Sequence, residues 1–120
     1  MSTTSHECRI HHEIRGDVDI LRLEGSMDAY SFPRLEVAFN DLSKNGRDRL
    51  VLDCSGLTFI NSAALGALIG HARRARERHG DVRLAALTPK IAGIVELLGF
   101  DRILQTFGDT SRAVESFAGL

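Results

Sequence analysis

The sequence has no excess of charge of one sign and only two cysteines. Its 15 basic and 16 acidic residues give a formal net charge of -1. Nucleic-acid-binding domains usually carry a basic excess, so this balance disfavours that function class. Cys8 lies near the terminus and Cys54 in an apolar run, so both are expected to be reduced thiols. The pair could in principle form one bridge, but the spacing of a secreted disulfide framework is absent.

Long apolar runs are also missing. No segment is apolar over the length needed to cross a bilayer, and the opening MSTTSHECRIHHE lacks the apolar stretch of a signal peptide. We therefore expect a cytoplasmic protein without membrane insertion. With 120 residues, 43% of them hydrophobic and 26% charged, the chain is predicted to form one domain over 1–120, with 1–5 as a flexible N-terminus.

Motifs for catalysis and for cofactor binding are absent as well. No Gly-x-Ser-x-Gly elbow surrounds Ser62, and the chain contains no Walker loop or dinucleotide fingerprint. His6, His11 and His12 lie near one another but lack a matching cysteine or carboxylate arrangement. We expect no catalytic residue, no cofactor and no metal.

What the sequence does contain is a regular alternation of strand and helix patterns. Strands are predicted at 7–14, 17–24, 50–53, 82–87 and 103–107, and helices at 33–44, 62–79, 89–98 and 110–117. The order ββαβαβαβα predicts an α/β domain with a mixed, mostly parallel sheet of about five strands and about four helices. The opening hairpin would form an antiparallel edge.

The most informative stretch runs from Leu50 to Gly70, LVLDCSGLTFINSAALGALIG. A buried strand should end at Asp53, and a loop carrying Ser55, Gly56 and Thr58 should follow. Phe59 and Ile60 are then expected to return to the core. Asn61 stands where a helix N-cap is needed, because its side-chain oxygen accepts a backbone N–H left unpaired at the helix start. Ser62 would open the helix.

These residues resemble a known family. A strand, D-x-S-G, an aromatic-apolar pair and then D-S-[SA]-[GA]-L is the signature of STAS domains, especially of anti-sigma factor antagonists. Gly25-Ser-Met-Asp28, predicted to be a loop, is similar to the G-x-x-D loop of the family, and the segment 97–101 is similar to the stretch after its third helix. The likeness therefore extends over nearly the whole chain.

The resemblance implies a protein-binding switch rather than an enzyme. In this family an anti-sigma factor, a serine kinase of the histidine-kinase-like ATPase fold, phosphorylates the serine that corresponds to Ser62, and a PP2C-type phosphatase restores it. The unphosphorylated protein binds the kinase and so frees a sigma factor. This sequence departs from the pattern at Asn61, where the family usually has Asp, so the cap is kept but a negative charge beside the acceptor is lost.

A helical wheel over 62–79 describes this surface independently of the resemblance. Ala64, Leu65, Leu68, Ala72 and Ala75 form the predicted core stripe, whereas the open side of the first two turns carries only small residues. Either a partner or another part of the same chain would pack there, and we favour a partner. The predicted partner-binding residues are Asp28, Asn61, Ser62, Ala63, Gly66, Ala67, Gly70 and Arg73.

Three alternatives stay open at this point. Asp28 either lines the same surface as Ser62, as the resemblance implies, or serves only as a loop residue. The basic run from Arg73 to Arg78 is interpreted as a solvated face, although it could attract an acidic partner or a phosphate. The chain is a sigma-pathway switch, a STAS component of another assembly such as a lipid-transport complex, or, more remotely, a small enzyme or nucleotide-binding domain.

Overall fold

The computed structural model describes residues 8–118. The expected flexible segment 1–5 and His6 lie outside the described residues. The elements are β1 (Cys8–Arg15), β2 (Val18–Met27), α1 (Phe32–Lys44), β3 (Arg49–Ile60), α2 (Ser62–Glu77), β4 (Asp81–Ala85), α3 (Pro89–Leu97), the short 3-10 helix η1 (Phe100–Arg102), β5 (Thr106–Phe107) and α4 (Thr110–Glu115).

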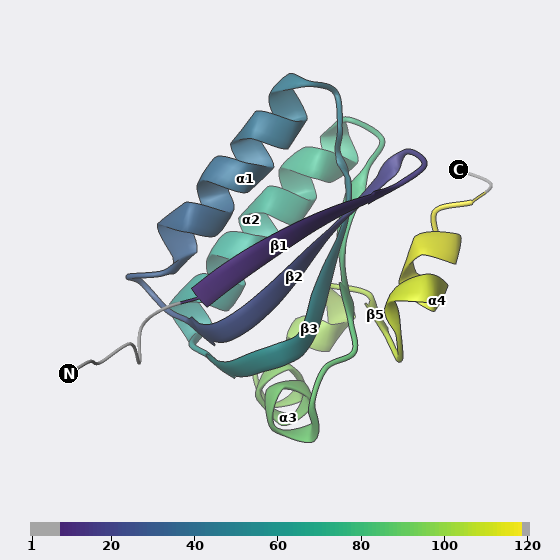
Figure 1. Ribbon diagram of the computed structural model, residues 1–120. Coiled ribbons are helices and arrows are strands. Elements are labelled where there is room, and N and C mark those ends of the chain that lie inside the picture. The colour runs from purple at the N-terminus through teal and green to yellow at the C-terminus, as the bar shows by residue number, and fades with distance from the viewer. Residues whose placement is uncertain (1–7, 119–120) are drawn as a thin grey trace.

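The strands form one five-stranded sheet in the order β1-β2-β3-β4-β5 (Figure 1). The β1–β2 hairpin is antiparallel, and the three following pairs are parallel. The predicted fold class and element order are therefore confirmed. Parallel neighbours require a crossover between them, and α1, α2 and α3 supply these connections.

Two cores lie on the two faces of the sheet. The larger core packs α1, α2 and α3 against one face, and the smaller packs α4 against the other, around Val51 and Phe117. Figure 1 shows α1 and α2 side by side on the first face. All five residues of the predicted core stripe of α2 are buried, so the interpretation of that face is confirmed: Ala64, Leu65, Leu68, Ala72 and Ala75.

The loops predicted at 25–28 and after Asp53 are wrong, because β2 and β3 continue through them to Met27 and Ile60. Register shifts between Arg22 and Glu24, and again between Gly25 and Ser26, let the two strands stay paired. Gly56 permits the close approach, since a Cβ there would lie 2.9 Å from Glu24 Cγ and 3.0 Å from the Leu23 carbonyl oxygen. Strand pairing satisfies the backbone polar groups that a loop would leave to water.

The last strand is shorter than predicted. The strand begins only at Thr106, because the amides of Ile103 and Leu104 donate back to the Phe100 carbonyl of η1, at 3.0 and 2.9 Å. Gly99 adopts φ 75°, a left-handed conformation that glycine tolerates without a steric penalty. Only Thr106 and Phe107 pair with β4.

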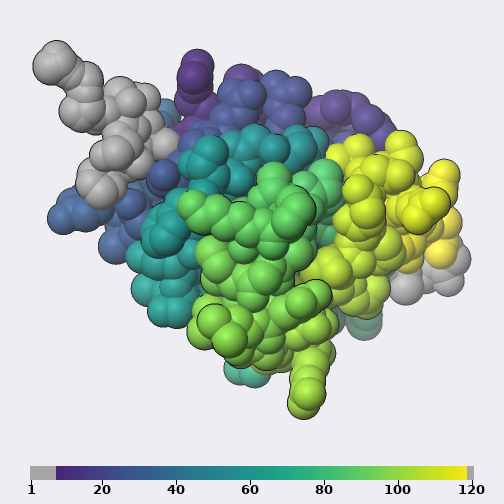
Figure 2. All heavy atoms as spheres, turned by 90° about the horizontal axis from the view of Figure 1, so that it is seen from below, coloured from purple at the N-terminus to yellow at the C-terminus, as the bar shows by residue number. Residues whose placement is uncertain are grey.

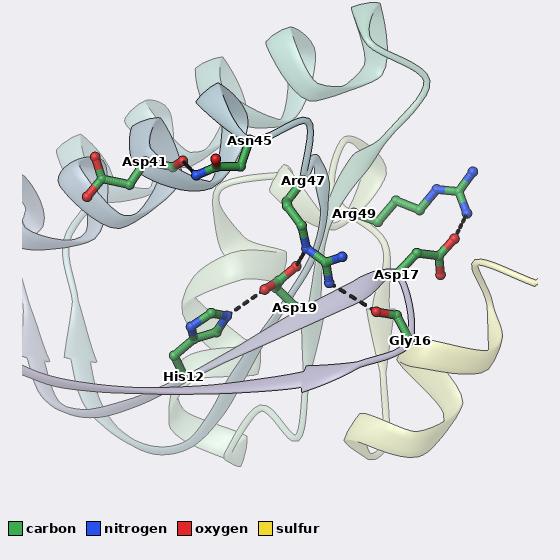
Figure 3. Close-up of polar contacts among 8 residues, drawn as sticks. All are labelled: His12, Gly16, Asp17, Asp19, Asp41, Asn45, Arg47 and Arg49. Atoms are coloured by element: carbon green, nitrogen blue, oxygen red, sulfur yellow. Dashed lines mark hydrogen bonds and ion pairs between the residues drawn. The ribbon is translucent and has the colours of Figure 1, made fainter.

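A buried carboxylate connects the hairpin to the segment after α1 (Figure 3). The side chain of Asp19 on β2 is 0% exposed. It accepts hydrogen bonds from Arg47 Nε at 2.6 Å and pairs with His12 Nε2 at 2.5 Å. Arg47 also donates to the Gly16 carbonyl at 3.1 Å, so one guanidinium joins two parts of the hairpin to the segment between α1 and β3. Sequence patterns did not predict this cluster.

Candidate functional site

The junction of β3 and α2 presents Ser62 to solvent. Ile60 pairs with Met27 at the end of the sheet, and Asn61 N–H donates to the Met27 carbonyl at 3.2 Å. Asn61 is extended and forms the predicted N-cap, its Oδ1 accepting from the Ala64 amide at 2.9 Å. Ser62 is exposed at the first position of the helix. Its hydroxyl therefore lies beside the free amides and the positive end of the helix dipole.

Asp28 follows β2 at the same end of the sheet. It comes directly after Met27, and Asn61 comes directly after Ile60, the residue that pairs with Met27. The Asp28 residue is only 9% exposed. Its Oδ1 accepts from the amides of Tyr30 at 2.9 Å and Ser31 at 3.2 Å. The carboxylate therefore shapes the turn into α1, which is the structural role expected of a loop residue, at a position adjoining Asn61.

The face of α2 next to Ser62 is lined with small residues. Ala63 and Gly66 are exposed, and Ala67 and Gly70 are half-buried. A Cβ added at Gly66 would meet no atom within 4 Å, and one at Gly70 would meet Arg74 Nη1 at 3.6 Å. Packing within residues 8–118 therefore does not require glycine at 66. Figure 2 looks onto this end of the molecule, where the teal atoms of the β3–α2 region lie beside the green atoms of α3.

The arginines of the basic run of α2 are exposed, but most of them form hydrogen bonds within the fold. Arg76 Nε donates to Asp81 Oδ1 at 2.8 Å, and Arg78 Nη1 donates to Ser43 Oγ at 2.9 Å. Arg74 Nη2 donates to His71 Nδ1 at 3.0 Å. Arg73 is exposed and forms no hydrogen bond or ion pair with the rest of the described chain. Three arginines of the run therefore make structural contacts, and Arg73 is an exposed cation on the side of the small residues.

Phe59 corrects an expectation about this site. The sequence predicts that it returns to the core, yet it is 40% exposed, while Ile60 is buried. The register shifts between β2 and β3 alter the simple alternation of inward and outward side chains, so the period of the pattern could not place it. The Lys90 ammonium lies 6.0 Å from the Phe59 ring centroid, at the outer limit of a cation–π contact.

Three buried titratable groups of the fold, Cys8, Cys54 and His71, have pKa values shifted by burial. Burial raises the pKa of the Cys54 thiol to about 12 and also raises that of Cys8, so both free cysteines stay protonated at neutral pH. His71, buried between α1 and α2, has a pKa below the ordinary 6.5, chiefly because burial penalises its charged form. Among residues 8–118, no three metal-ligating side chains gather into a metal site.

The family model described as "Mlab, STAS domain" matches residues 10–106. The chain belongs to the STAS domain family. Within the described part of the chain, no helix has the length and apolar character needed to cross a membrane.

The chain is also similar to anti-sigma factor antagonists. The anti-sigma F factor antagonist of Paenibacillus polymyxa is 22% identical over 105 residues, 87% of each chain. An anti-sigma factor antagonist structure from Mycobacterium paratuberculosis has a TM-score of 0.84 at 20% identity and 98% coverage of both chains. Unphosphorylated SpoIIAA, an anti-sigma factor antagonist, has a TM-score of 0.78 at 16% identity, covering 93% of this chain and 98% of its own. The phosphorylated form of that Bacillus protein matches with a TM-score of 0.69 at 15% identity, covering 90% and 98%.

Proposed function

We propose that this chain is an anti-sigma factor antagonist, a non-enzymatic binding protein that phosphorylation of Ser62 switches off. One observation carries the proposal. Ser62 is exposed as the first residue of α2, beside a helix face of small residues that the described fold leaves open. The names of the relatives support the function class. The existence of SpoIIAA in phosphorylated and unphosphorylated forms supports the mode of control.

The partner is an anti-sigma factor serine kinase of the histidine-kinase-like ATPase fold, and a PP2C-type phosphatase reverses the modification. The kinase docks on the α2 face around Ser62, Ala63, Gly66, Ala67 and Gly70, where small side chains let another backbone approach closely. Asp28 and Asn61 shape the edge of this surface, and Arg73 is its free cation. Binding sequesters the kinase and releases a sigma factor.

Phosphorylation would block docking without unfolding the protein. A phosphoserine carries about -1.5 to -2 charges at neutral pH. At a helix N-terminus an anion is favoured by roughly 0.3–1 kcal/mol, so the fold tolerates the group. Against an acidic or apolar partner surface, a loss of about 3 kcal/mol would weaken binding by roughly two orders of magnitude.

The test compares Ser62→Ala and Ser62→Asp in titrations against purified candidate kinases from the source organism. Ser62→Ala is expected to bind like the unmodified protein, and Ser62→Asp to lose binding. Ser111→Asp is the matched control, because Ser111 is also exposed in the first turn of a helix, α4. Equal affinity of both Ser62 variants for a kinase that binds the parent protein would refute the switch.

A second candidate is a STAS component of another assembly, such as a lipid-transport complex, without control at Ser62. Two observations favour it: Asn61 stands where the antagonists usually have Asp, and the matching family model carries the Mlab description. Incubation with ATP and each candidate kinase, followed by mass spectrometry, separates the two. Phosphate on Ser62 supports the first function, and its absence with every kinase that binds supports the second.

A further inference from the structure

A cleft of about 370 Å³ lies between α1 and α2, at the ends of these helices that are farthest from Ser62. Its apolar floor consists of Phe39, Leu50, Ala75 and Val82. Polar groups form the rest of its lining: Asn40, Ser43, Lys44, Asp48, His71, Arg74 and Arg78. Its volume falls in the range of small-molecule sites, and the combination of an apolar floor with convergent polar groups is typical of them.

The charge of the cleft is positive. Lys44, Arg74 and Arg78 contribute three cations, and Asp48 contributes the one carboxylate of its lining. Arg78 Nη1 lies 3.9 Å from Asp48 Oδ1, which partly neutralises that guanidinium. Within residues 8–118, neither Lys44 nor Arg74 has a carboxylate within ion-pair distance. Two cations of the cleft therefore form no direct ion pair with a carboxylate of the described residues.

Contacts inside the cleft hold the arginines in place. Arg74 Nη2 donates to Nδ1 of His71, a side chain that is 8% exposed and whose ring centroid is 4.7 Å from that of Phe39. Because burial lowers the pKa of His71, the ring stays neutral and accepts this bond at Nδ1, while its Nε2 faces Glu36 Oε2 at 3.4 Å. Arg78 reaches from α2 to Ser43 on α1. Such donors are positioned before a ligand arrives, which reduces the entropy lost on binding.

The helix dipoles explain only part of this arrangement. α1 and α2 both end near the cleft, and cations near helix C-termini are favoured by the negative end of the helix dipole. The favourable interaction of cations with helix C-termini accounts for the basic residues on the last turns. It does not account for an open cleft between the helices with an apolar floor, because a dipole interaction requires no cavity.

We propose that this cleft binds a small organic anion. Lys44, Arg74 and Arg78 would hold its carboxylate or phosphate group, and its apolar body would lie against Phe39 and Leu50. Arginine suits both head groups, because its planar guanidinium offers two parallel donors. The site lies at the opposite end of α2 from Ser62 and does not depend on the function proposed above. It gives the basic run of α2 a ligand-binding role in addition to its structural contacts.

The test is an NMR titration of the full chain with benzoate and with phenyl phosphate, which share the ring and differ in the anionic group. Saturable amide shifts around the cleft are expected, with a dissociation constant on the order of 1 mM for at least one probe. Phenol measures binding of the ring without an anionic group, and inorganic phosphate measures binding of the anionic group without the ring. Both should bind about tenfold more weakly than the better probe, which corresponds to roughly 1.4 kcal/mol.

Charge-removal variants provide the control. Lys44→Gln combined with Arg78→Gln changes two exposed side chains and should weaken the better probe about tenfold. Arg112→Gln removes an exposed cation from α4, far along the chain from the cleft lining, and should leave the affinity unchanged. Unsaturable shifts for both anions overturn the proposal. So does equal weakening by the cleft variant and by Arg112→Gln.

Discussion

Asn61 Oδ1 accepts a hydrogen bond from the Ala64 amide at 2.9 Å, so the residue before Ser62 fixes the start of α2. Asn61→Ala removes this cap and should lower the free energy of unfolding by about 0.5–2 kcal/mol. Asn61→Asp keeps the acceptor and adds a charge that the helix dipole favours by roughly 0.3–1 kcal/mol. Urea unfolding of the three proteins checks this order. A lower free energy of unfolding for Asn61→Asp than for Asn61→Ala would contradict this prediction.

Gly66 gives a prediction that separates folding from docking. A methyl group at this position meets open space, so Gly66→Ala should stabilise the protein by up to about 1 kcal/mol through helix propensity. Gly66→Leu should also fold, yet it should lose affinity for the proposed kinase because its side chain projects into the docking surface. Gly93→Leu on α3 is the matched control, since a Cβ there also meets no atom within 4 Å. Calorimetric titration and thermal unfolding measure the two effects.

The buried carboxylate of Asp19 predicts a large loss of stability. Asp19→Asn leaves Arg47 and His12 without their anionic partner and should lower the free energy of unfolding by about 3 kcal/mol. This value is at the lower end for a broken buried ion pair, because Arg47 is partly exposed. Asp17→Asn removes an exposed partner of Arg49 instead. That control should change the free energy of unfolding by less than about 1 kcal/mol. Similar urea midpoints for the two variants would show that the Asp19 cluster contributes little.

His71 should make stability depend on pH on the acidic side of neutrality. Its pKa in the folded protein lies below 6.5, so the unfolded chain binds the proton more readily. The stabilising contribution is therefore complete above an unfolded pKa of about 6.5 and is lost as the pH falls from there toward the folded value. His71→Gln should flatten the slope of unfolding free energy in this window.

His79→Gln is the control for that experiment, because His79 is exposed at the end of α2. The comparison uses slopes against pH rather than absolute stabilities, since either substitution also changes packing or turn geometry. Parallel slopes for the parent protein and His71→Gln would remove His71 as the source of the pH dependence.

Several features of this protein could be predicted from its sequence because they depend on neighbours along the chain. The buried stripe of α2 from Ala64 to Ala75 follows from the helical period, and the Asn61 cap follows from side-chain chemistry at a helix start. The alternation of strands and helices was sufficient to predict the mixed sheet. Local patterns of this kind are readable without knowing what the chain packs against.

Other features were decided only when distant segments met. The register shifts between β2 and β3 extend both strands and leave Phe59 exposed, and no local period contains that information. Asp19 is buried because Arg47 and His12 come to it from other segments, and His71 is buried because Phe32 and Phe39 of α1 surround it. The cleft beside Arg74 likewise exists only where α1 and α2 pack. Pairing and burial are properties of contacts far apart in sequence, so tertiary structure alone determines them.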